Sequence, residues 1–354
     1  MAFLKILSSP TLAQLSEFDE IIDVRSPSEF SLDHIPGARN CPVLDDEERA
    51  KIGTFYKQDP FLAKKMGAAM VSRNIARHLE TSLLDKPRTW RPLIYCWRGG
   101  KRSGAMAHIL SEIGWHTVRL EGGYKAYRKM VLEALDRLPE RFEFRVICGA
   151  TGCGKSRLIK ALSGIGEQVL DLEEIARHRG SVLGKMPGIE QPGQKYFESC
   201  IWHILSGFDP GKPVYIESES KKIGNLRVPQ AVMDAMWKSR CIRIEASVSV
   251  RSRILNEEYR HFFGQPEILF AQLDRLMELH GHETIGSWKS MAERGEWDLL
   301  IKTLLENHYD RAYEKSITKH YATYSEMPVH EVFDPTEPGF KALAEKILAS
   351  SLAD

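Results

Sequence analysis

Short apolar runs alternate with stretches of helical spacing through the first third of the chain. The runs rich in aliphatic and aromatic residues predict buried strands at 20–25, 92–95 and 117–120. Apolar residues that recur three or four positions apart predict helices at 68–84, 104–113 and 127–138. Because strands and helices alternate, we expect a parallel sheet with helices on its faces, formed by a first domain over residues 1–135.

The rest of the chain continues this alternation and then becomes helical. Further strands are predicted at 144–148, 168–171, 213–217 and 241–246. Residues 254–320 keep a helical spacing, and a terminal helix is predicted over 341–352. We therefore expect a second α/β domain over 140–250 and a helical region over 251–354 that packs on it.

Composition restricts the kinds of partner. The chain of 354 residues carries a formal net charge of only +1, so a nucleic-acid partner would need a local basic face. Six cysteines without paired spacing suit a reducing compartment. The apolar start of the chain is too short for a signal sequence, and no run approaches transmembrane length. We expect a soluble, cytoplasmic protein with no membrane partner.

A cysteine at a predicted strand–helix junction is the first candidate for chemistry. The loop after Cys96 consists of Trp97, Arg98, Gly99, Gly100, Lys101, Arg102 and Ser103. Backbone N–H groups of a glycine-containing loop at a helix N-terminus bind anions, and basic side chains add positive charge. Such surroundings favour a reactive thiolate, which makes Cys96 the candidate nucleophile. The alternative is a buried, inert cysteine, since cysteine is among the most buried residue types.

A second glycine-rich loop follows the predicted strand at 144–148. It matches the phosphate-binding pattern Gly-x4-Gly-Lys-Ser and precedes a predicted helix at 157–162; its residues are Gly149, Ala150, Thr151, Gly152, Cys153, Gly154, Lys155 and Ser156. Its amides and Lys155 would bind a diphosphate, and the Ser156 hydroxyl could hold Mg²⁺. The strand at 213–217 ends in Glu217 where a nucleoside triphosphatase usually has Asp. ATP hydrolysis therefore stays open, and any diphosphate ester would suit the loop.

Other polar residues of this second domain are candidates for substrate or Mg²⁺ contacts. They are Asp171, His178, Arg179, Glu217, Arg251 and Arg253. Asp171 and Glu173 follow a predicted strand and should lie at the phosphate side of the sheet. The tracts 178–181 and 191–198 are polar, basic and loop-like. The arginines could cover phosphates or simply lie on a solvated helix face. No metal site is certain, and zinc at the cysteines that flank the phosphate loop would compete with the anion.

Four motifs of the first domain resemble those of rhodanese sulfurtransferases. In chain order they are 23–25 (Asp-Val-Arg), 34–37 (His-Ile-Pro-Gly), the Cys96 loop and 121–124 (Glu-Gly-Gly-Tyr). The resemblance implies that Cys96 carries a chalcogen and that the Asp/Arg pair is architectural. The spacing from Cys96 to Arg102 is also that of protein phosphatases, which suggests a phosphate-bearing chalcogen donor attacked at the chalcogen by Cys96. Dephosphorylation is the rival, although Tyr95 stands where those phosphatases have His.

Taken together, the two loops and three further motifs resemble the bacterial tRNA 2-selenouridine synthase family across nearly the whole chain. The motifs read HRGS at 178–181, QPGQKYFE at 191–198 and IESESKKIG at 216–224. The resemblance implies a rhodanese-like domain followed by a P-loop domain. It also implies a substrate, 2-thiouridine at the wobble position of tRNAs for Lys, Glu and Gln. This base would first be S-geranylated with geranyl diphosphate and then selenated with selenophosphate. The second reaction would need a source of selenophosphate. Cys96 would carry selenium, and Lys155, Ser156 and the loop amides would stabilise departing pyrophosphate.

Two other functions remain open at this stage. One is an ATP-dependent tRNA sulfurtransferase in which the P-loop activates the acceptor. The other is a module whose rhodanese fold acts as a phosphatase or binds passively, switched by the P-loop. The oligomeric state, the tRNA-contacting face and the need for Mg²⁺ do not follow from the sequence.

Overall fold

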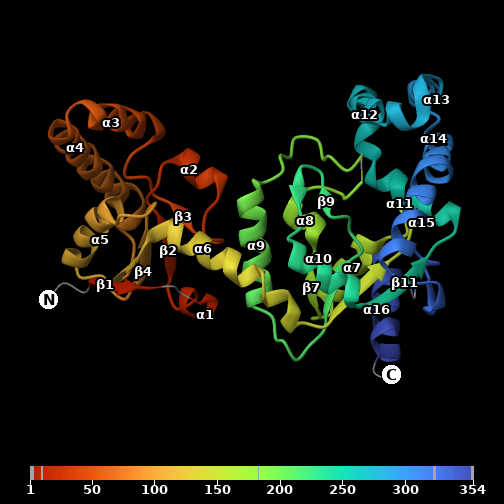
Figure 1. Ribbon diagram of the computed structural model, residues 1–354, viewed down its shortest axis with the longest axis horizontal. Helices are drawn as coiled ribbons and strands as arrows, with labels where there is room; N and C mark the ends of the chain where they lie inside the picture. Colours follow the sequence, from red (N-terminus) through yellow and green to blue (C-terminus); the bar gives the residue numbers. More distant parts are fainter. Residues whose placement is uncertain (1–3, 9–10, 182, 322–323, 352–354) are drawn as a thin grey trace. The chain divides into compact units, whose positions relative to one another are not determined.

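A computed structural model describes residues 4–8, 11–181, 183–321 and 324–351. The chain forms two compact units, each of which is an α/β fold (Figure 1). Unit 1 comprises Met1–Asp136 and Pro192–Gly207, and unit 2 comprises Arg137–Gln191 and Phe208–Asp354. The predicted α/β class is confirmed, with a parallel sheet in each unit.

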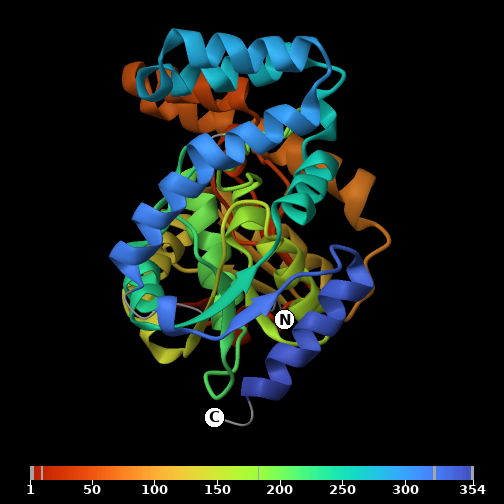
Figure 2. The same ribbon diagram turned by 90° about the vertical axis from the view of Figure 1, so that its right-hand side faces the viewer.

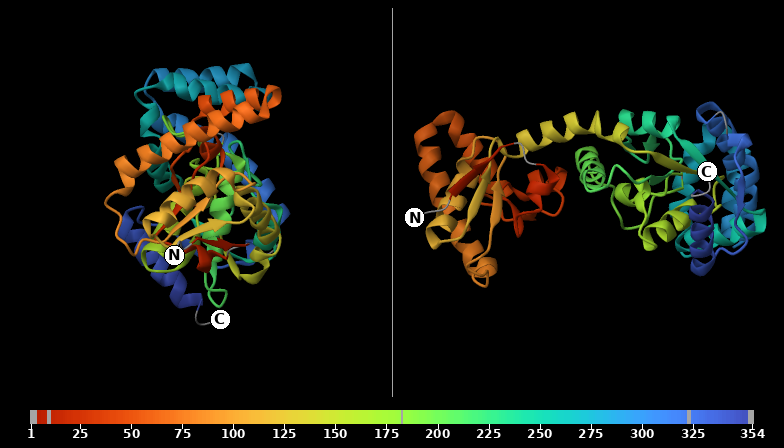
Figure 3. Two further views of the ribbon diagram at one scale, coloured as in Figure 1. Left: turned by 90° about the vertical axis from the view of Figure 1, so that its left-hand side faces the viewer. Right: turned by 90° about the horizontal axis from the view of Figure 1, so that it is seen from below.

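Unit 1 is built on a five-stranded parallel sheet in the order β1-β5-β4-β2-β3 (Figure 3). The strands are β1 (Leu4–Leu7), β2 (Glu20–Asp23), β3 (Arg39–Asn40), β4 (Pro92–Tyr95) and β5 (Thr117–Leu120). The helices are α1 (Leu12–Leu15), α2 (Pro27–Leu32), α3 (Asp46–Gln58), α4 (Pro60–His78), α5 (Lys101–Ile113), α6 (Gly123–Leu135) and α9 (Gln194–Ser206). The strands predicted in this part of the chain are confirmed as β2, β4 and β5.

Helices α4 and α5 cover one face of this sheet. Ile75 of α4 and Met106 and Leu110 of α5 are fully buried together with Ile22 and Ile94 of the strands. The strand β4 is buried at all four positions, as expected for a central parallel strand. This packing fixes the end of β4, from which the cysteine loop departs.

Unit 2 contains a second five-stranded parallel sheet, in the order β12-β11-β6-β8-β7. The strands of unit 2 are β6 (Phe144–Cys148), β7 (Gln168–Leu170), β8 (Val214–Glu217), β11 (Arg240–Glu245) and β12 (Val329–Glu331), with a separate antiparallel hairpin of β9 (Lys222–Ile223) and β10 (Leu226–Arg227). The helices are α7 (Lys155–Gly164), α8 (Leu172–Ala176), α10 (Gln230–Lys238), α11 (Val248–Glu258), α12 (Pro266–Leu273), α13 (Met277–Glu293), α14 (Trp297–Leu304), α15 (Asp310–His320) and α16 (Glu337–Ser351). Figure 2 shows β12 beside β11, with α16 near the sheet.

The helical part of unit 2 has an apolar core of its own. Phe262, Leu273, Trp288, Leu300 and Leu305 are buried there, which explains the helical spacing read from the sequence. The terminal helix α16 packs against α7 and begins earlier than predicted; residue 352, where the prediction ended, lies outside the described residues. None of the helices within the described ranges is long and apolar enough to cross a bilayer.

Helix α9 departs from the sequence predictions. The tract 191–198 was expected to be a loop, but it is helical from Gln194 onward. Residues 192–207 lie within the range expected for the second domain, yet they group with unit 1 because α9 packs against α6. The rings of Trp202 and Tyr127 meet edge to face with centroids 5.7 Å apart. This aromatic contact ties a late segment of the chain to the first sheet.

Candidate functional site

The cysteine loop of unit 1 connects the end of β4 to the start of α5. Within the described residues, no group accepts a hydrogen bond from the backbone N–H groups of residues 97–103. Cys96 is 3% exposed, and its Sγ accepts a hydrogen bond from the Ser103 hydroxyl at 3.3 Å. The loop therefore offers a series of amide donors around a sulfur that is buried but hydrogen-bonded to a polar neighbour.

The basic residues of this loop have different roles. Arg98 and Lys101 are exposed. Arg102 instead forms an ion pair with Glu29 at 2.7 Å. Burial alone would raise the pKa of Glu29, but the hydrogen bond and charge of Arg102 outweigh it, and the pKa is lowered. Arg102 therefore helps to fix the loop, and its charge is compensated in part, because Glu29 also pairs with Arg49 at 2.9 Å.

Arg119 of β5 is a further cation at the loop that sequence reasoning missed. Its Nη1 lies against the loop and the first turn of α5, where Cβ atoms added at Gly100 and Gly104 would be 3.3 and 3.2 Å away. No local pattern in the sequence could have indicated this, because the contact depends on the pairing of β4 with β5.

A buried polar network supports the loop. Arg25 forms an ion pair with Asp23 at 2.6 Å and donates to the Asp33 carbonyl at 2.6 Å. The Tyr124 hydroxyl donates to Asp33 Oδ2 at 2.7 Å, and burial raises the pKa of the Asp33 carboxyl. Asp23 and Arg25 were expected to be architectural, and the fully buried ion pair agrees with that expectation. Asp33 was not foreseen.

The first turn of α6 holds the backbone of the cysteine loop. The Tyr124 amide donates to the Cys96 carbonyl at 2.8 Å, and the Lys125 amide donates to the Trp97 carbonyl at 3.0 Å. Gly123 has φ +58°, and a Cβ at this position would lie 2.2 Å from the Cys96 carbonyl oxygen. Only glycine permits so close an approach, which explains the second glycine of the motif at 121–124.

The phosphate loop of unit 2 has the expected strand, loop and helix around it. It runs from the end of β6 to α7, and Gly154 caps the helix in the left-handed conformation, against the Phe340 ring. Lys155 Nζ donates to the Gly149 carbonyl at 2.9 Å. Burial would lower the pKa of Lys155, but the carboxylates of Glu217 and Glu219 outweigh it and the pKa is raised. The lysine therefore stays charged at the loop.

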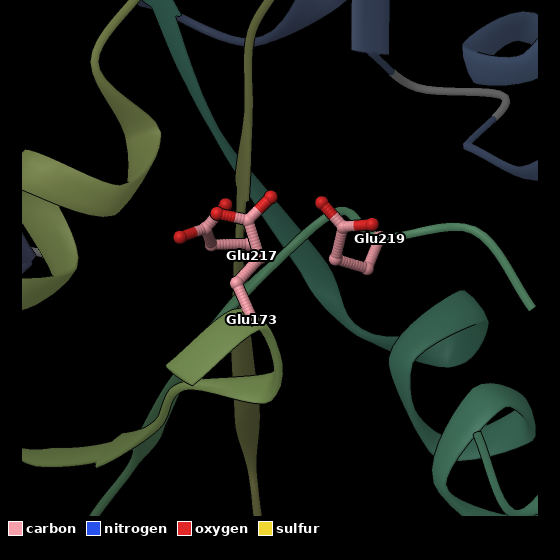
Figure 4. Close-up of side chains that lie close together, drawn as sticks. All are labelled: Glu173, Glu217 and Glu219. Carbon is pink, nitrogen blue, oxygen red and sulfur yellow. The ribbon is translucent and has the colours of Figure 1, made fainter. Parts of the chain in front are cut away.

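A cluster of glutamates lies beside this loop (Figure 4). Carboxylate oxygens of Glu173, Glu217 and Glu219 lie within 4.8 Å of one another. Ser156 Oγ donates to Glu173 Oε2 at 2.9 Å. Glu217 is 2% exposed, and its Oε1 has no hydrogen-bond partner among the described residues.

The electrostatics of this cluster favour a bound cation. Burial first, and then the Glu219 carboxylate, raise the pKa of Glu173 to about 8. Burial and the charge of Glu173 raise the pKa of Glu217 as well. Oxygen ligands in this number suit a hard divalent cation such as Mg²⁺. Sequence reasoning selected Glu217 but did not combine it with Glu173 and Glu219, because β8 and α8 bring them together only in the fold.

The phosphate loop opens on a cleft of about 1330 Å³ within unit 2. Its polar lining includes Lys155, Ser156, the three glutamates and three predicted residues: Asp171, His178 and Arg179. Asp171 also caps α8 by accepting from the Glu174 amide at 2.8 Å, and Arg179 donates to the Glu258 carbonyl at 2.7 Å. The apolar and aromatic lining consists of Met186, Ile189, Met233, Trp237, Ile254, Leu255, Tyr259, Tyr309, Ala312, Tyr313, Ile317 and Tyr321.

Arg251 and Arg253 do not line this cleft. Arg251 is buried, donates to the Thr151 carbonyl at 2.8 Å and pairs with Asp310. Arg253 is exposed on the same helix. The suggestion that they cover bound phosphates stays a prediction, and in this structure Arg251 braces the phosphate loop through the Thr151 carbonyl.

The folds and sites define a protein that joins a rhodanese-type unit to a P-loop unit. A family model described as the rhodanese-like domain matches residues 8–130, and one described as the tRNA 2-selenouridine synthase AAA domain matches residues 142–266. Proteins called tRNA 2-selenouridine synthase are similar over most of the chain. The one from Sulfurovum is 33% identical over 92% of this chain and 91% of its own length, and the one from Alcanivorax borkumensis is 31% identical over 86% and 91%.

The chain belongs to the tRNA 2-selenouridine synthase family. Another relative of that name, from Nitrosomonas europaea, is 37% identical over 68% of this chain. The match covers 63% of that relative's length, and a match to Nitrosomonas eutropha covers 60%, so the chain spans about three fifths of these two relatives.

Proposed function

We propose that this protein replaces the sulfur of 2-thiouridine in tRNA by selenium, by way of an S-geranyl intermediate. The observation that carries the proposal is the cleft of unit 2, where a diphosphate-binding loop opens on aliphatic and aromatic walls. A prenyl diphosphate has an anionic head and an apolar tail that match both parts of the cleft; the base of a nucleoside triphosphate could stack on the same aromatic side chains, so the assay below compares the two ligands. Family membership supplies the tRNA substrate.

In the first step the thiocarbonyl sulfur of the base attacks C1 of geranyl diphosphate. A C–S bond forms, the C–O bond to diphosphate breaks, and the base loses its N3 proton. Lys155, Ser156 and the loop amides stabilise the charge that develops on the departing pyrophosphate. A divalent cation held by Ser156 and the glutamate cluster, if bound, would neutralise diphosphate oxygens.

In the second step a selenium nucleophile derived from selenophosphate adds at C2, and geranylthiolate leaves. We assign the handling of selenium to unit 1, where the amides of residues 97–103 can hold the phosphate of the donor beside Cys96. Selenophosphate carries selenium at the selenide level, so cleavage of its P–Se bond to phosphate and selenide supplies this nucleophile without an oxidant. A selenium atom bonded to the Cys96 sulfur would instead need a two-electron oxidant to form the S–Se bond and a thiol reductant to break it. The proposed acceptors are the tRNAs for Lys, Glu and Gln, and a selenophosphate-producing enzyme is the proposed source.

Mass spectrometry of nucleosides from a thiolated anticodon stem-loop, incubated with the full chain, tests both assignments. With geranyl diphosphate alone, Lys155→Ala should lose at least tenfold in S-geranylation rate, and the exposed Lys238→Ala should match the wild type. With selenophosphate added, Cys96→Ser should accumulate S-geranyl-2-thiouridine.

Cys41→Ser is the matched control for the cysteine, because burial raises the pKa of the Cys41 thiol to about 11 and leaves it inert. Normal geranylation by Lys155→Ala would refute the role of the phosphate loop. ATP turnover stimulated by the stem-loop, with no geranyl transfer, would favour the ATP-dependent sulfurtransferase instead.

A further inference from the structure

The residue after Cys96 is an exposed tryptophan. All seven tryptophans of the chain lie in the described ranges, and Trp97 is the one among them that is exposed, at 44%. Trp90, Trp115, Trp202 and Trp288 are buried. Single exposed aromatic residues are normal on a protein surface, and Phe61 is more exposed than Trp97. Trp97 differs from it in directly following the candidate nucleophile Cys96, in a loop of basic residues.

The indole is held on a rigid base. It stacks on the Tyr124 ring with centroids 5.3 Å apart and an angle of 26° between the planes. Tyr124 is 3% exposed, its hydroxyl donates to Asp33, and the Arg25 guanidinium carbon lies 4.1 Å from its ring centroid. Because Arg25 is itself fixed by the buried pair with Asp23, the support below the indole is set before any ligand binds.

The backbone that carries the indole is equally fixed. The carbonyls of Cys96 and Trp97 both accept hydrogen bonds from the first turn of α6. The backbone position of the indole, one residue after Cys96, is therefore determined by the fold.

The charges around the indole identify the chemical class of the ligand. Arg98 and Lys101 are exposed on the same loop and have no ion-pair partner in the described part of the chain. An aromatic surface flanked by free cations is typical of proteins that bind single-stranded nucleic acid, because bases stack on the ring while phosphates meet the cations. A prenyl chain would instead favour the apolar walls of the cleft in unit 2.

We propose that the exposed face of Trp97 is the stacking platform for the base that is to be modified, presented by an unpaired RNA segment, and that Arg98 and Lys101 contact the adjacent phosphates. This inference rests on the proposed function, since it takes tRNA as the substrate. It adds the residue that places the base beside Cys96.

Binding of an anticodon stem-loop to the full chain, measured by fluorescence anisotropy, tests the platform. Two probes are compared, one with 2-thiouridine and one with an abasic site at the wobble position. Trp97→Ala should weaken binding of the thiouridine probe about tenfold, in line with the loss of one stacked base. Trp97→Phe should stay within about threefold of the wild type, and Phe61→Ala, which removes another exposed aromatic of unit 1, should not change binding.

The abasic probe separates stacking from structural damage. Wild type and Trp97→Ala should bind it equally, so that the effect of the substitution disappears with the base. If Trp97→Ala loses the same affinity for both probes, or for neither, stacking on Trp97 is refuted. The proposal that the protein binds tRNA would not be affected by either result. If Trp97→Ala loses affinity for geranyl diphosphate and keeps its affinity for RNA, the indole contacts the prenyl chain, and the proposed stacking platform is also refuted. If the wild type binds neither probe, the proposed tRNA substrate fails together with the platform.

Discussion

Replacing Glu219 by Gln is expected to stabilise the metal-free protein and to remove its response to Mg²⁺. Burial is the largest cause of the raised pKa of Glu173, and the Glu219 carboxylate is the next. The Gln side chain keeps the shape of Glu219 and removes its charge. The substitution therefore relieves repulsion in the cluster and also removes a ligand from the proposed cation site.

The pKa of Glu173 sets the size of this effect. A carboxyl whose pKa rises from 4.5 in the unfolded chain to about 8 in the folded protein lowers the free energy of unfolding by roughly 3 kcal/mol at pH 7. The folded state binds the proton more tightly, so the stability is fully present below pH 4.5 and is lost as the pH rises through about 8. Glu219→Gln should recover part of it, on the order of 1 kcal/mol, or about 2–4 °C in melting temperature.

Thermal unfolding at pH 8, in EDTA and in excess MgCl₂, measures both halves of the prediction. The wild type should gain about 2.7 kcal/mol when Mg²⁺ is present at 100 times its Kd, and Glu219→Gln should gain much less. Glu174→Gln is the matched control, because Glu174 is exposed on α8 and lies outside the cluster. If Glu219→Gln melts below the wild type in EDTA and still responds fully to Mg²⁺, the three glutamates neither repel one another nor bind the cation.

Two further predictions concern the supports of the two loops. Gly123→Ala should destabilise the protein by about 3 kcal/mol in urea unfolding, because its Cβ would overlap the Cys96 carbonyl. Gly114 also has a positive φ, but a Cβ added there would meet no atom within 4 Å. Gly114→Ala should therefore lower the free energy of unfolding by only about 1 kcal/mol. Arg251→Met should destabilise the protein by about 2 kcal/mol and weaken pyrophosphate binding measured by calorimetry, because the phosphate loop loses its hydrogen bond from Arg251 to the Thr151 carbonyl. Arg253→Met should leave both unchanged, and an equal effect of the two substitutions would contradict the bracing role.

The central strands and both glycine loops were predictable because their signals are local. The run at 92–95 is apolar at every position, and the phosphate-loop pattern needs only eight consecutive residues. Helix α9 was missed at its start, where polar residues and a glycine obscured the apolar spacing of Phe197, Ile201 and Leu205. The helix belongs to unit 1 because it packs on α6. The sequence around α9 does not indicate that contact, since α6 lies far away in the chain.

Candidate site residues were predictable where they lie next to a glycine loop, and not where the sheet brings distant residues together. Glu173 and Glu219 meet because β7 pairs with β8. Arg119 reaches the cysteine loop because β5 pairs with β4. Arg251 was selected for its place at the start of a predicted helix after the strand at 241–246, and the sequence could not show that its guanidinium pairs with Asp310 and donates to the Thr151 carbonyl.

The two loops share one architecture but differ in the charge that surrounds them, and this difference bears on which ligand we propose for each. Both place amides at the end of a parallel strand and the start of a helix, which suits an anion. The loop of unit 1 has uncompensated cations in Arg98 and Lys101, so an anionic donor can bind there without a metal. The loop of unit 2 has Lys155 facing three glutamates, an arrangement that would favour a diphosphate that enters together with a divalent cation. This difference supports our proposal that pyrophosphate is expelled in unit 2 and that transfer from a phosphorylated chalcogen donor takes place in unit 1.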